Sequence, residues 1–203
     1  MPEAPRLDRA FFRSDPVSVA KRLLGQRLVH VANGRRVAGL IVETEAYLGH
    51  VDKAAHSYGR RRTQRTETMF ADGGTVYVFL NYGIHRLLNF VVAGVDQPQA
   101  VLLRALEPVE GLDEMRARRP KAKRDTDLCS GPGKLGAALG IELAHDGTDL
   151  TTSGSLFVER VRTRAISRSQ IVIRPRIGVG YAEEWADAPL RFYVVGNPHV
   201  SRR

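Results

Sequence analysis

The 203-residue sequence lacks most features that would cross-link a protein or place it in a membrane. Its one cysteine, Cys129, excludes an internal disulfide framework and a cysteine-cluster zinc site. Six histidines are scattered without the paired spacing of metal ligands, so we expect no metal. No apolar run is long enough to span a bilayer, and the first residues do not resemble a secretory signal. These absences predict an intracellular protein that does not enter a membrane.

Acidic residues are too few to balance the basic ones. Lys and Arg number 31 against 22 Asp and Glu, which gives a formal net charge of +9. Basic side chains cluster at residues 59–65 and 116–124, beside turn-forming residues, and such loops readily reach backbone phosphates. The charge balance predicts a polyanionic partner, nucleic acid first. For either cluster taken alone, a solvated basic surface explains the pattern equally well.

The distribution of apolar residues predicts one strand-rich domain. Residues 15–25 are typical of a short helix, with Asp15 as N-cap and Gly25 past the end. Asn33-Gly34 then joins two apolar runs into a hairpin. A meander of strands is expected at 74–108, followed by helices at 110–118 and 130–139. Later strands are expected at 155–159, 169–179 and 190–196.

Strands dominate this pattern, and the helices are placed unevenly among them. We therefore expect an α+β fold: a single compact domain with a curved, mainly antiparallel sheet and surrounding helices. The domain should span residues 1–203, with residues 1–14 as a loosely ordered N-terminal segment.

Two carboxylates stand where a hydrophobic strand ends, in the stretch VETEAYLG. Side chains alternate along a strand, so Glu43, Glu45 and Tyr47 should share one face, with Ile41 before them. The two glutamates would then lie roughly 6.6 Å apart, a spacing that suits the carboxylate pair of an inverting glycosidase. Carboxylates on the surface or in salt bridges would produce the same sequence pattern. Three interpretations stay open: solvated charges, a sugar-cleaving pair, or one catalytic carboxylate and its support.

Other polar residues interrupt apolar runs. Asn89 and Arg104 do so, and a buried amide or guanidinium is costly unless another group pairs with it. Glu43 or Glu45 is a candidate partner for Arg104, in an internal ion pair or in a catalytic site. Tyr82 lies in the turn NYG, where a large ring has little core to enter, and an exposed ring beside basic loops can stack on a base or wedge into a duplex.

The helix start CSGPGKL offers free backbone N–H groups, with Ser130 as the expected cap. Lys134 nearby makes this a candidate phosphate site, although any capped helix gives the same pattern. In the cluster at 116–124, Arg118 and Arg119 are the candidate DNA contacts. No glycine-rich nucleotide motif is present, and nothing requires a cofactor.

Five segments match a known family, in order, over residues 15 to 201. They are VETEAYLG…AAHS, GTVYVFLNYGIHRLLN, AVLLRALEPVEGLDEMR, LCSGPGKL and RIGVGYAEEWADAPLRFYVVGNPHVS. Together they resemble the alkyladenine (3-methyladenine) DNA glycosylase family. The resemblance implies a metal-independent enzyme that flips a damaged purine out of double-stranded DNA and hydrolyses its N-glycosidic bond. Members act on alkylated purines such as 3-methyladenine and 7-methylguanine, and some on hypoxanthine or ethenoadenine. We expect a monomer located with the DNA.

The resemblance also implies roles for individual residues. Glu45 matches the family's catalytic general base, and Arg104 matches the arginine beside it. Glu43 is then expected to support the site or to pair with Arg104. No lysine or N-terminal amine is evidently placed as a nucleophile, which favours a monofunctional glycosylase that leaves an abasic site.

The base pocket and the duplex contact follow from the same resemblance. Tyr47 and His56 match residues that line the flipped-base pocket, and Asn89 matches an asparagine that helps to discriminate against normal guanine. Tyr82 matches the tyrosine wedged into the duplex gap. Phe79 departs from the mammalian relatives, which carry tyrosine there; ring stacking is kept, but any hydroxyl contact is lost.

Two other classes of protein are weighed against this one. A carbohydrate glycosidase would use Glu43 and Glu45 as a pair, but a sugar site has no use for a net charge of +9. A non-enzymatic nucleic-acid-binding module would keep both carboxylates as structural groups. Release of a free base from damaged DNA separates the glycosylase from both alternatives.

Overall fold

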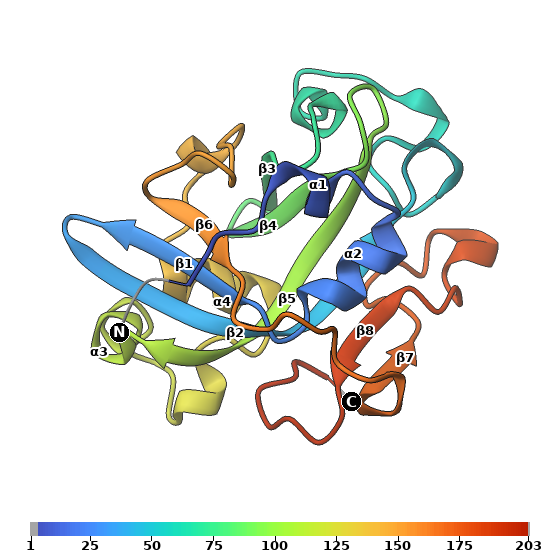
Figure 1. Cartoon of the computed structure of the whole chain (residues 1–203). Coiled ribbons are helices and arrows are strands. Elements are labelled where there is room, and N and C mark those ends of the chain that lie inside the picture. The colour runs from blue at the N-terminus through green and yellow to red at the C-terminus, as the bar shows by residue number, and fades with distance from the viewer. Residues whose placement is uncertain (1–3, 203) are drawn as a thin grey trace.

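One curled antiparallel sheet organises the chain in the computed structural model, which describes residues 4–202 (Figure 1). Its strands are β1 Arg27–Ala32, β2 Arg35–Tyr47, β3 Val76–Asn81, β4 His85–Val92, β5 Gln99–Glu110, β6 Leu156–Glu159, β7 Ile171–Arg174 and β8 Arg191–Val194. The α helices of the described residues are α1 Arg9–Phe12, α2 Pro16–Leu23, α3 Leu112–Arg118 and α4 Pro132–Leu139. The expected α+β fold with a curved antiparallel sheet is confirmed.

Strand β2 is the centre of the sheet. The strand order is β3-β4-β5-β2-β1-β6, and β8 pairs with both β2 and β7. Along one side β2 pairs with β5; along the other its first half pairs with β1, and residues 43–45 pair with β8. The end of β2 that carries the two glutamates therefore lies between β5 and β8.

Local sequence signals account for the first elements. The Asp15 side chain accepts a hydrogen bond from the Ser18 N–H at 2.9 Å, which caps α2 as expected. Asn33 and Gly34 both have positive φ, 53° and 72°, the geometry of a two-residue hairpin turn between β1 and β2. Gly25, with φ of 79°, follows the end of the helix. The predicted helix and hairpin are both confirmed.

The sheet separates an apolar core from a more polar face. Alternate residues of β3, β4 and β5 join the main core; they are Val76, Val78, Leu88, Phe90, Val101 and Leu103. The residues between them line a cavity on the opposite side; they include Tyr77, Phe79, Leu87, Asn89, Leu102 and Arg104. The period of two along each strand thus sorts core residues from candidate site residues.

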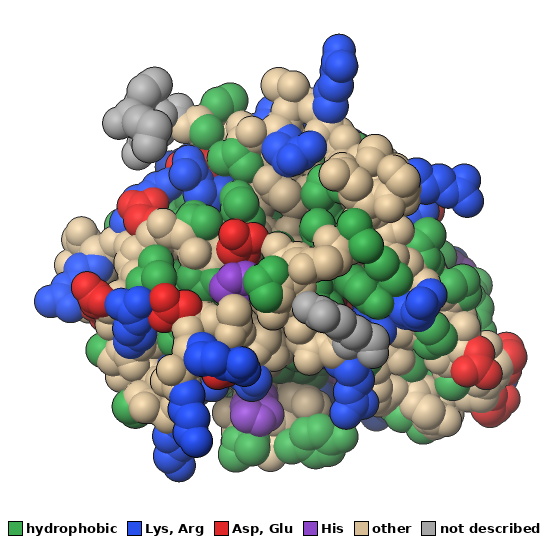
Figure 2. Space-filling model, turned by 90° about the horizontal axis from the view of Figure 1, so that it is seen from below, with side chains coloured by type: hydrophobic (Ala, Val, Ile, Leu, Met, Phe, Trp, Pro, Cys, Tyr) green, Lys and Arg blue, Asp and Glu red, His purple; other side chains and the backbone are tan. Residues whose placement is uncertain are grey.

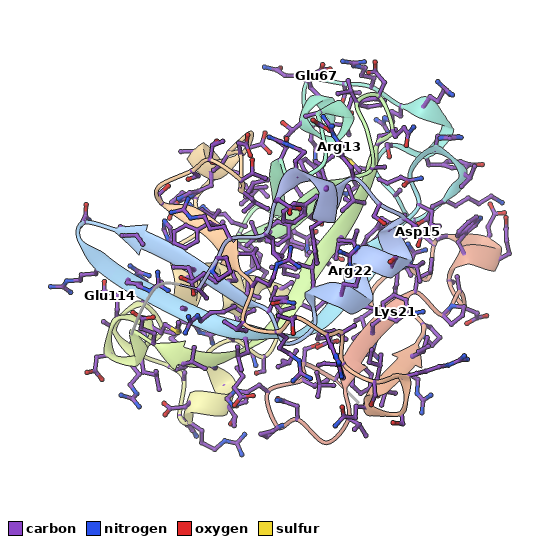
Figure 3. All side chains as sticks on the ribbon, viewed as in Figure 1. Arg13, Asp15, Lys21, Arg22, Glu67 and Glu114 are labelled. Atoms are coloured by element: carbon purple, nitrogen blue, oxygen red, sulfur yellow. The ribbon has the colours of Figure 1, made fainter. Side chains whose placement is uncertain are left out.

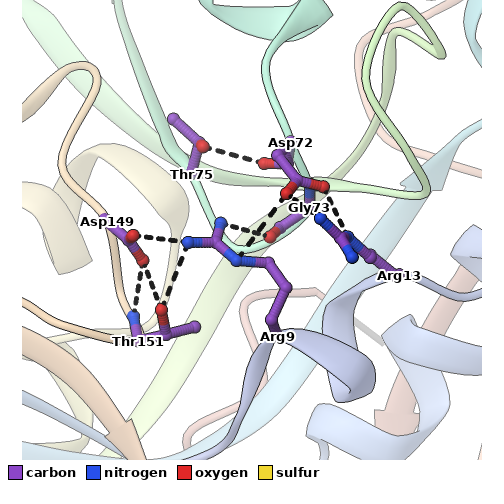
Figure 4. A network of polar contacts seen from close by, with 7 residues as sticks. All are labelled: Arg9, Arg13, Asp72, Gly73, Thr75, Asp149 and Thr151. Atoms are coloured by element: carbon purple, nitrogen blue, oxygen red, sulfur yellow. Dashed lines mark hydrogen bonds and ion pairs between the residues drawn. The ribbon is translucent and has the colours of Figure 1, made fainter.

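The expectation of a loosely ordered segment over residues 1–14 is wrong for its later part. Helix α1 buries Phe12 completely in the main core. Figure 4 shows Arg9 and Arg13 on either side of Asp72, with their Nε atoms 3.8 Å and 2.8 Å from carboxylate oxygens. Aromatic burial and charge pairing fix this segment to the loop before β3. The first three residues lie outside the described part of the chain.

Two local predictions need correction. Ser130 does not cap α4: Gly131 occupies the N-cap position without a side-chain bond, and the Ser130 hydroxyl instead accepts from Lys134 Nζ at 3.2 Å. The strand expected over 169–179 is shortened to β7, because a proline follows and cannot donate to a strand ladder.

Basic side chains outnumber acidic ones on one face of the molecule. Figure 2 shows Lys and Arg side chains spread over one face, with fewer acidic ones and apolar patches between them. No helix within residues 4–202 has the length and apolar character that a membrane span requires.

Candidate active site

A cavity of about 360 Å³ opens on the polar face of the sheet. This volume is within the range of small-molecule pockets. The end of β2, strands β3 to β5, the start of α4 and two loops form its wall. It brings together most of the residues that the sequence singled out; six of them line it, namely Tyr47, His56, Phe79, Tyr82, Asn89 and Arg104.

Irregular pairing in the middle of β2 sets which side chains face the site. The register with β5 shifts between Ile41 and Glu43 and again between Glu43 and Thr44. Ile41 packs in the main core instead of sharing the face of the glutamates, so that part of the alternation prediction is wrong. Such bulges re-aim side chains and are frequent beside active sites.

Glu45 is fully buried, directly behind the cavity wall. Its Oε1 accepts from the Ile177 N–H at 2.8 Å and lies 3.2 Å from Arg104 Nη1, and its Oε2 accepts from the Tyr47 hydroxyl at 2.9 Å. Those three donors all belong to residues that line the cavity. A carboxylate has about four lone-pair positions, so Oε2 keeps acceptor capacity beyond its contacts with the described residues.

Burial and the polar neighbours of Glu45 shift its pKa in opposite directions. Burial raises the pKa of Glu45, while Arg104, the Ile177 N–H and the Tyr47 hydroxyl act to lower it; the net pKa is above the ordinary 4.5. Burial also raises the pKa of Tyr47 well above its usual range. Tyr47 therefore stays protonated and donates to the carboxylate.

Glu43 is held in a different environment. Its Oε1 accepts from Arg104 Nε and Arg191 Nη1, both at 3.0 Å, and its Oε2 accepts from the Ser201 N–H at 2.7 Å. The predicted pairing of Glu43 with Arg104 is confirmed. Because two guanidinium groups and a main-chain N–H hold Glu43, it is not free to act as the second carboxylate of a sugar-cleaving pair.

Aromatic rings form one wall of the cavity. His56 Nδ1 lies 2.9 Å from the Tyr77 hydroxyl, and its ring contacts Phe79 edge-on at 4.5 Å between centroids. Tyr77 and Phe79 stack at 5.5 Å. Burial and the charges of Arg65 and Arg61 lower the pKa of His56 to about 4. His56 is therefore a neutral hydrogen-bonding group at neutral pH.

Asn89 is fixed by the main chain around it. Its Nδ2 donates to the carbonyls of Tyr77 and Leu87 at 3.2 and 3.3 Å. Both amide hydrogens are used, so only the side-chain oxygen remains for a ligand. A buried amide held at two points presents a rigid surface to the cavity.

Tyr82 stands at the mouth of the cavity with 87% of its surface exposed. It is the second residue of a turn closed by the Ile84 N–H, which donates to the Asn81 carbonyl at 3.1 Å. Its φ of 49° is unusual for a bulky residue and costs about 1–3 kcal/mol. The hairpin thus keeps a large ring in water and in a strained conformation.

Helix α4 braces this hairpin by close packing. A Cβ at Gly136 would lie 2.3 Å from the Arg86 carbonyl oxygen, and one at Gly133 would lie 2.8 Å from the His85 ring. Glycine at both positions lets the helix approach β4, and Pro132 at its start then lines the cavity.

The remaining basic candidates do not line the cavity. Lys134 is exposed on the first turn of α4, two residues after Pro132, which does line it. Arg118 and Arg119 each donate to a main-chain carbonyl, at 3.1 and 3.2 Å. Arg118 packs against Gly140, about 12 Å along the helix from its start. The structure does not bring these two arginines to the cavity, and their contact with DNA stays a prediction.

The sequence did not lead us to a buried ion pair, Arg176 with Asp52, that lies beside the site. Arg176 Nη2 donates to Asp52 Oδ1 at 2.8 Å, and both side chains are fully buried. Asp52 also accepts from the Leu48 and Ala54 N–H groups at 3.0 Å. This pair fixes the loop after Tyr47 to the segment before Ile177. Arg176 interrupts an apolar run as Arg104 does, and that signal could have found it.

Such a site suits an enzyme that draws a flat aromatic group into a cavity beside a buried carboxylate, and the basic surface points to nucleic acid as the source of that group. The profile of the methylpurine-DNA glycosylase (MPG) family matches residues 10–198. The chain therefore belongs to the methylpurine-DNA glycosylase family and is a DNA glycosylase, a hydrolase of N-glycosyl bonds. The expectation from the sequence motifs is confirmed.

Bacterial relatives align over nearly the whole chain. A protein of Bacillus cereus (strain AH187), named "Putative 3-methyladenine DNA glycosylase", is 48% identical over 201 residues, which cover 96% of this chain and 98% of the relative. A protein of the same name from Bacillus anthracis (strain CDC 684 / NRRL 3495) is 47% identical over the same coverage.

Proposed function

We propose that this DNA glycosylase flips alkylated or deaminated purines out of duplex DNA and hydrolyses their N-glycosidic bond with a water activated by Glu45. The substrates are 3-methyladenine and 7-methylguanine, with hypoxanthine and ethenoadenine among the neutral lesions. The product is an abasic site. One copy of the chain acts on one lesion, and Lys134 contacts a backbone phosphate.

The observation that carries this proposal is the position of Glu45. Its carboxylate is buried behind a cavity lined by aromatic rings, and three donors fix it while leaving acceptor capacity on Oε2. Bond breaking develops positive charge on the sugar, which a nearby carboxylate stabilises while it orients or deprotonates water. Arg104 and the Tyr47 hydroxyl hold the carboxylate in place.

The direct test uses duplexes that each contain one defined lesion. After incubation with enzyme in excess, free base is detected by mass spectrometry and the abasic site by alkaline strand cleavage. Release of free base with an alkali-labile site supports the proposal. Binding without release from any of the four lesions would leave only a DNA-binding role.

The raised pKa of Glu45 has a consequence for the pH profile. Glu45 acts as the carboxylate, so its protonation stops the reaction. Because burial raises its pKa above 4.5, we expect the single-turnover rate to fall on the acidic side at a higher pH than an ordinary glutamate gives. The measurement is base release against pH; a rate still at its maximum at pH 4.5 contradicts the role of Glu45.

Replacing Tyr82 with alanine should weaken capture of the extruded nucleotide more than its chemistry. The ring is proposed to fill the gap in the base stack, and stacking contributes about 1–3 kcal/mol, or roughly 5- to 150-fold in affinity. The cost should be smallest for lesions that already pair poorly, and Tyr82→Phe is the control. Equal losses for well-paired and mispaired lesions count against the wedge.

Phe79→Tyr restores the hydroxyl carried by mammalian relatives. We expect release of cationic 3-methyladenine to change by less than about tenfold, or 1.4 kcal/mol, because stacking against His56 and Tyr77 is kept. Neutral lesions should respond more. Single-turnover rates on both kinds of lesion measure this, and a larger change for 3-methyladenine assigns the main role to the hydroxyl.

A further inference from the structure

A second concave surface lies on the other side of the sheet. It is a groove of about 410 Å³ between α2 and the segment that leads into β7. Its apolar lining is Ala165, Ile166, Ile171 and Ile173, and its polar lining is Ser18, Lys21, Arg22 and Arg168. No carboxylate lines it in the part of the chain that the structure describes.

The groove faces away from the proposed DNA contact. Helix α2 packs on the core side of β2, where the Thr44 hydroxyl donates to the Ala20 carbonyl at 3.0 Å. Glu45 lies on the opposite side of the same strand, against the cavity. DNA bound at the cavity would therefore leave the groove uncovered.

Two of the groove's cations rest on aromatic rings. Lys21, labelled with Arg22 on α2 in Figure 3, has its Nζ 5.0 Å from the centroid of the Phe192 ring. The Arg22 guanidinium lies 4.2 Å above Phe11. Cation–π contacts position a charge without neutralising it, so both groups keep their capacity to pair with an anion.

The neighbouring sequence strengthens this positive field. Residues 160–182 contain no acidic residue and six arginines, of which Arg176 is paired with Asp52 and Arg160 lies 3.8 Å from Asp8. Arg168 is exposed at the groove, and Arg162 and Arg164 are exposed just before it. Opposite charges steer association and set specificity, so the complementary partner is anionic.

We propose that this groove docks an acidic segment of another protein that carries bulky apolar side chains. The isoleucines would bury the apolar anchors, and the cations would pair with carboxylates around them, as in interfaces with an apolar centre and a polar rim. Nucleic acid fits less well, because phosphate groups make no favourable contact with the isoleucine side chains that line the groove. The proposal is independent of the lesion that the enzyme removes.

The probe is a fluorescein-labelled peptide in which four aspartates precede a leucine and a phenylalanine. We expect saturable binding by fluorescence anisotropy, weakened at least tenfold in R22E/R168E. Base release and the melting temperature of that variant should remain near those of the native chain. If R22E/R168E does not fold, R168E alone, at an exposed position just before β7, should weaken binding at least threefold.

Matched controls separate docking from general charge attraction. K121E/K123E makes the same change in net charge on exposed residues elsewhere, and it should bind the peptide normally. Equal weakening in that variant overturns the proposal, as does undiminished binding of a peptide with serine in place of leucine and phenylalanine. Displacement of the peptide by undamaged duplex DNA, or preferential binding of anionic phospholipid vesicles to the groove, would also overturn it.

Discussion

Glu45→Gln should leave lesion-duplex binding near normal and nearly abolish release of hypoxanthine. Glutamine keeps the shape and the acceptor for the Ile177 N–H, but it removes both the charge and the ability to take a proton from water. General-base catalysis contributes about 10²–10⁴ in rate, and the lost stabilisation of the cationic sugar adds to this. Release of 3-methyladenine should fall less, because its bond is already weakened by the charge on the base.

The measurement pairs single-turnover base release with lesion-duplex affinity. A parallel loss of affinity would indicate that the substitution disturbs the cavity, since Tyr47 and Arg104 both contact this carboxylate. The acidic limb of the pH profile should also vanish from the residual activity. Near-normal release of hypoxanthine by Glu45→Gln would sink the proposed mechanism.

Glu43→Gln should have the opposite balance, with a large loss of stability and a smaller loss of activity. Glu43 neutralises Arg104 and Arg191 in a buried network, and removing one partner of a buried ion pair costs about 3–5 kcal/mol. For a domain of this size each kcal/mol lowers the melting temperature by about 2–4 °C. Activity should fall only because Arg104, which contacts both glutamates, is displaced from its position beside Glu45.

Thermal unfolding and single-turnover release on both variants separate the two glutamates. The control is Glu107→Gln, a half-buried glutamate of the adjacent strand β5 that accepts from Asn197 and lies outside the cavity. Glu107→Gln should change neither the melting temperature nor the single-turnover rate strongly. A collapse of activity in Glu43→Gln with normal stability, together with an active Glu45→Gln, would reverse the assignment.

Several site residues could be predicted from the sequence because they are of a type that is unfavourable in their local surroundings. Arg104 and Asn89 interrupt apolar runs, and Tyr82 occupies a turn position that disfavours a large ring. Each such conflict marks a group that needs a partner or serves a function. Arg176 broke the same rule and was overlooked; its partner Asp52 is 124 positions away.

Local chemistry in the sequence determined the elements, and the resemblance of its motifs to a known family gave the class of enzyme. The cap at Asp15, the Asn33-Gly34 turn and the alternation in β3 to β5 act over a few residues, so they can be read without the fold. The family motifs predicted the roles of Glu45 and its neighbours. Only the tertiary structure decided that Glu43 is paired with Arg191 and accepts from the Ser201 N–H, and that the Ile177 N–H donates to Glu45. Those contacts join segments more than 130 residues apart, and no local pattern specifies which distant groups the sheet brings together.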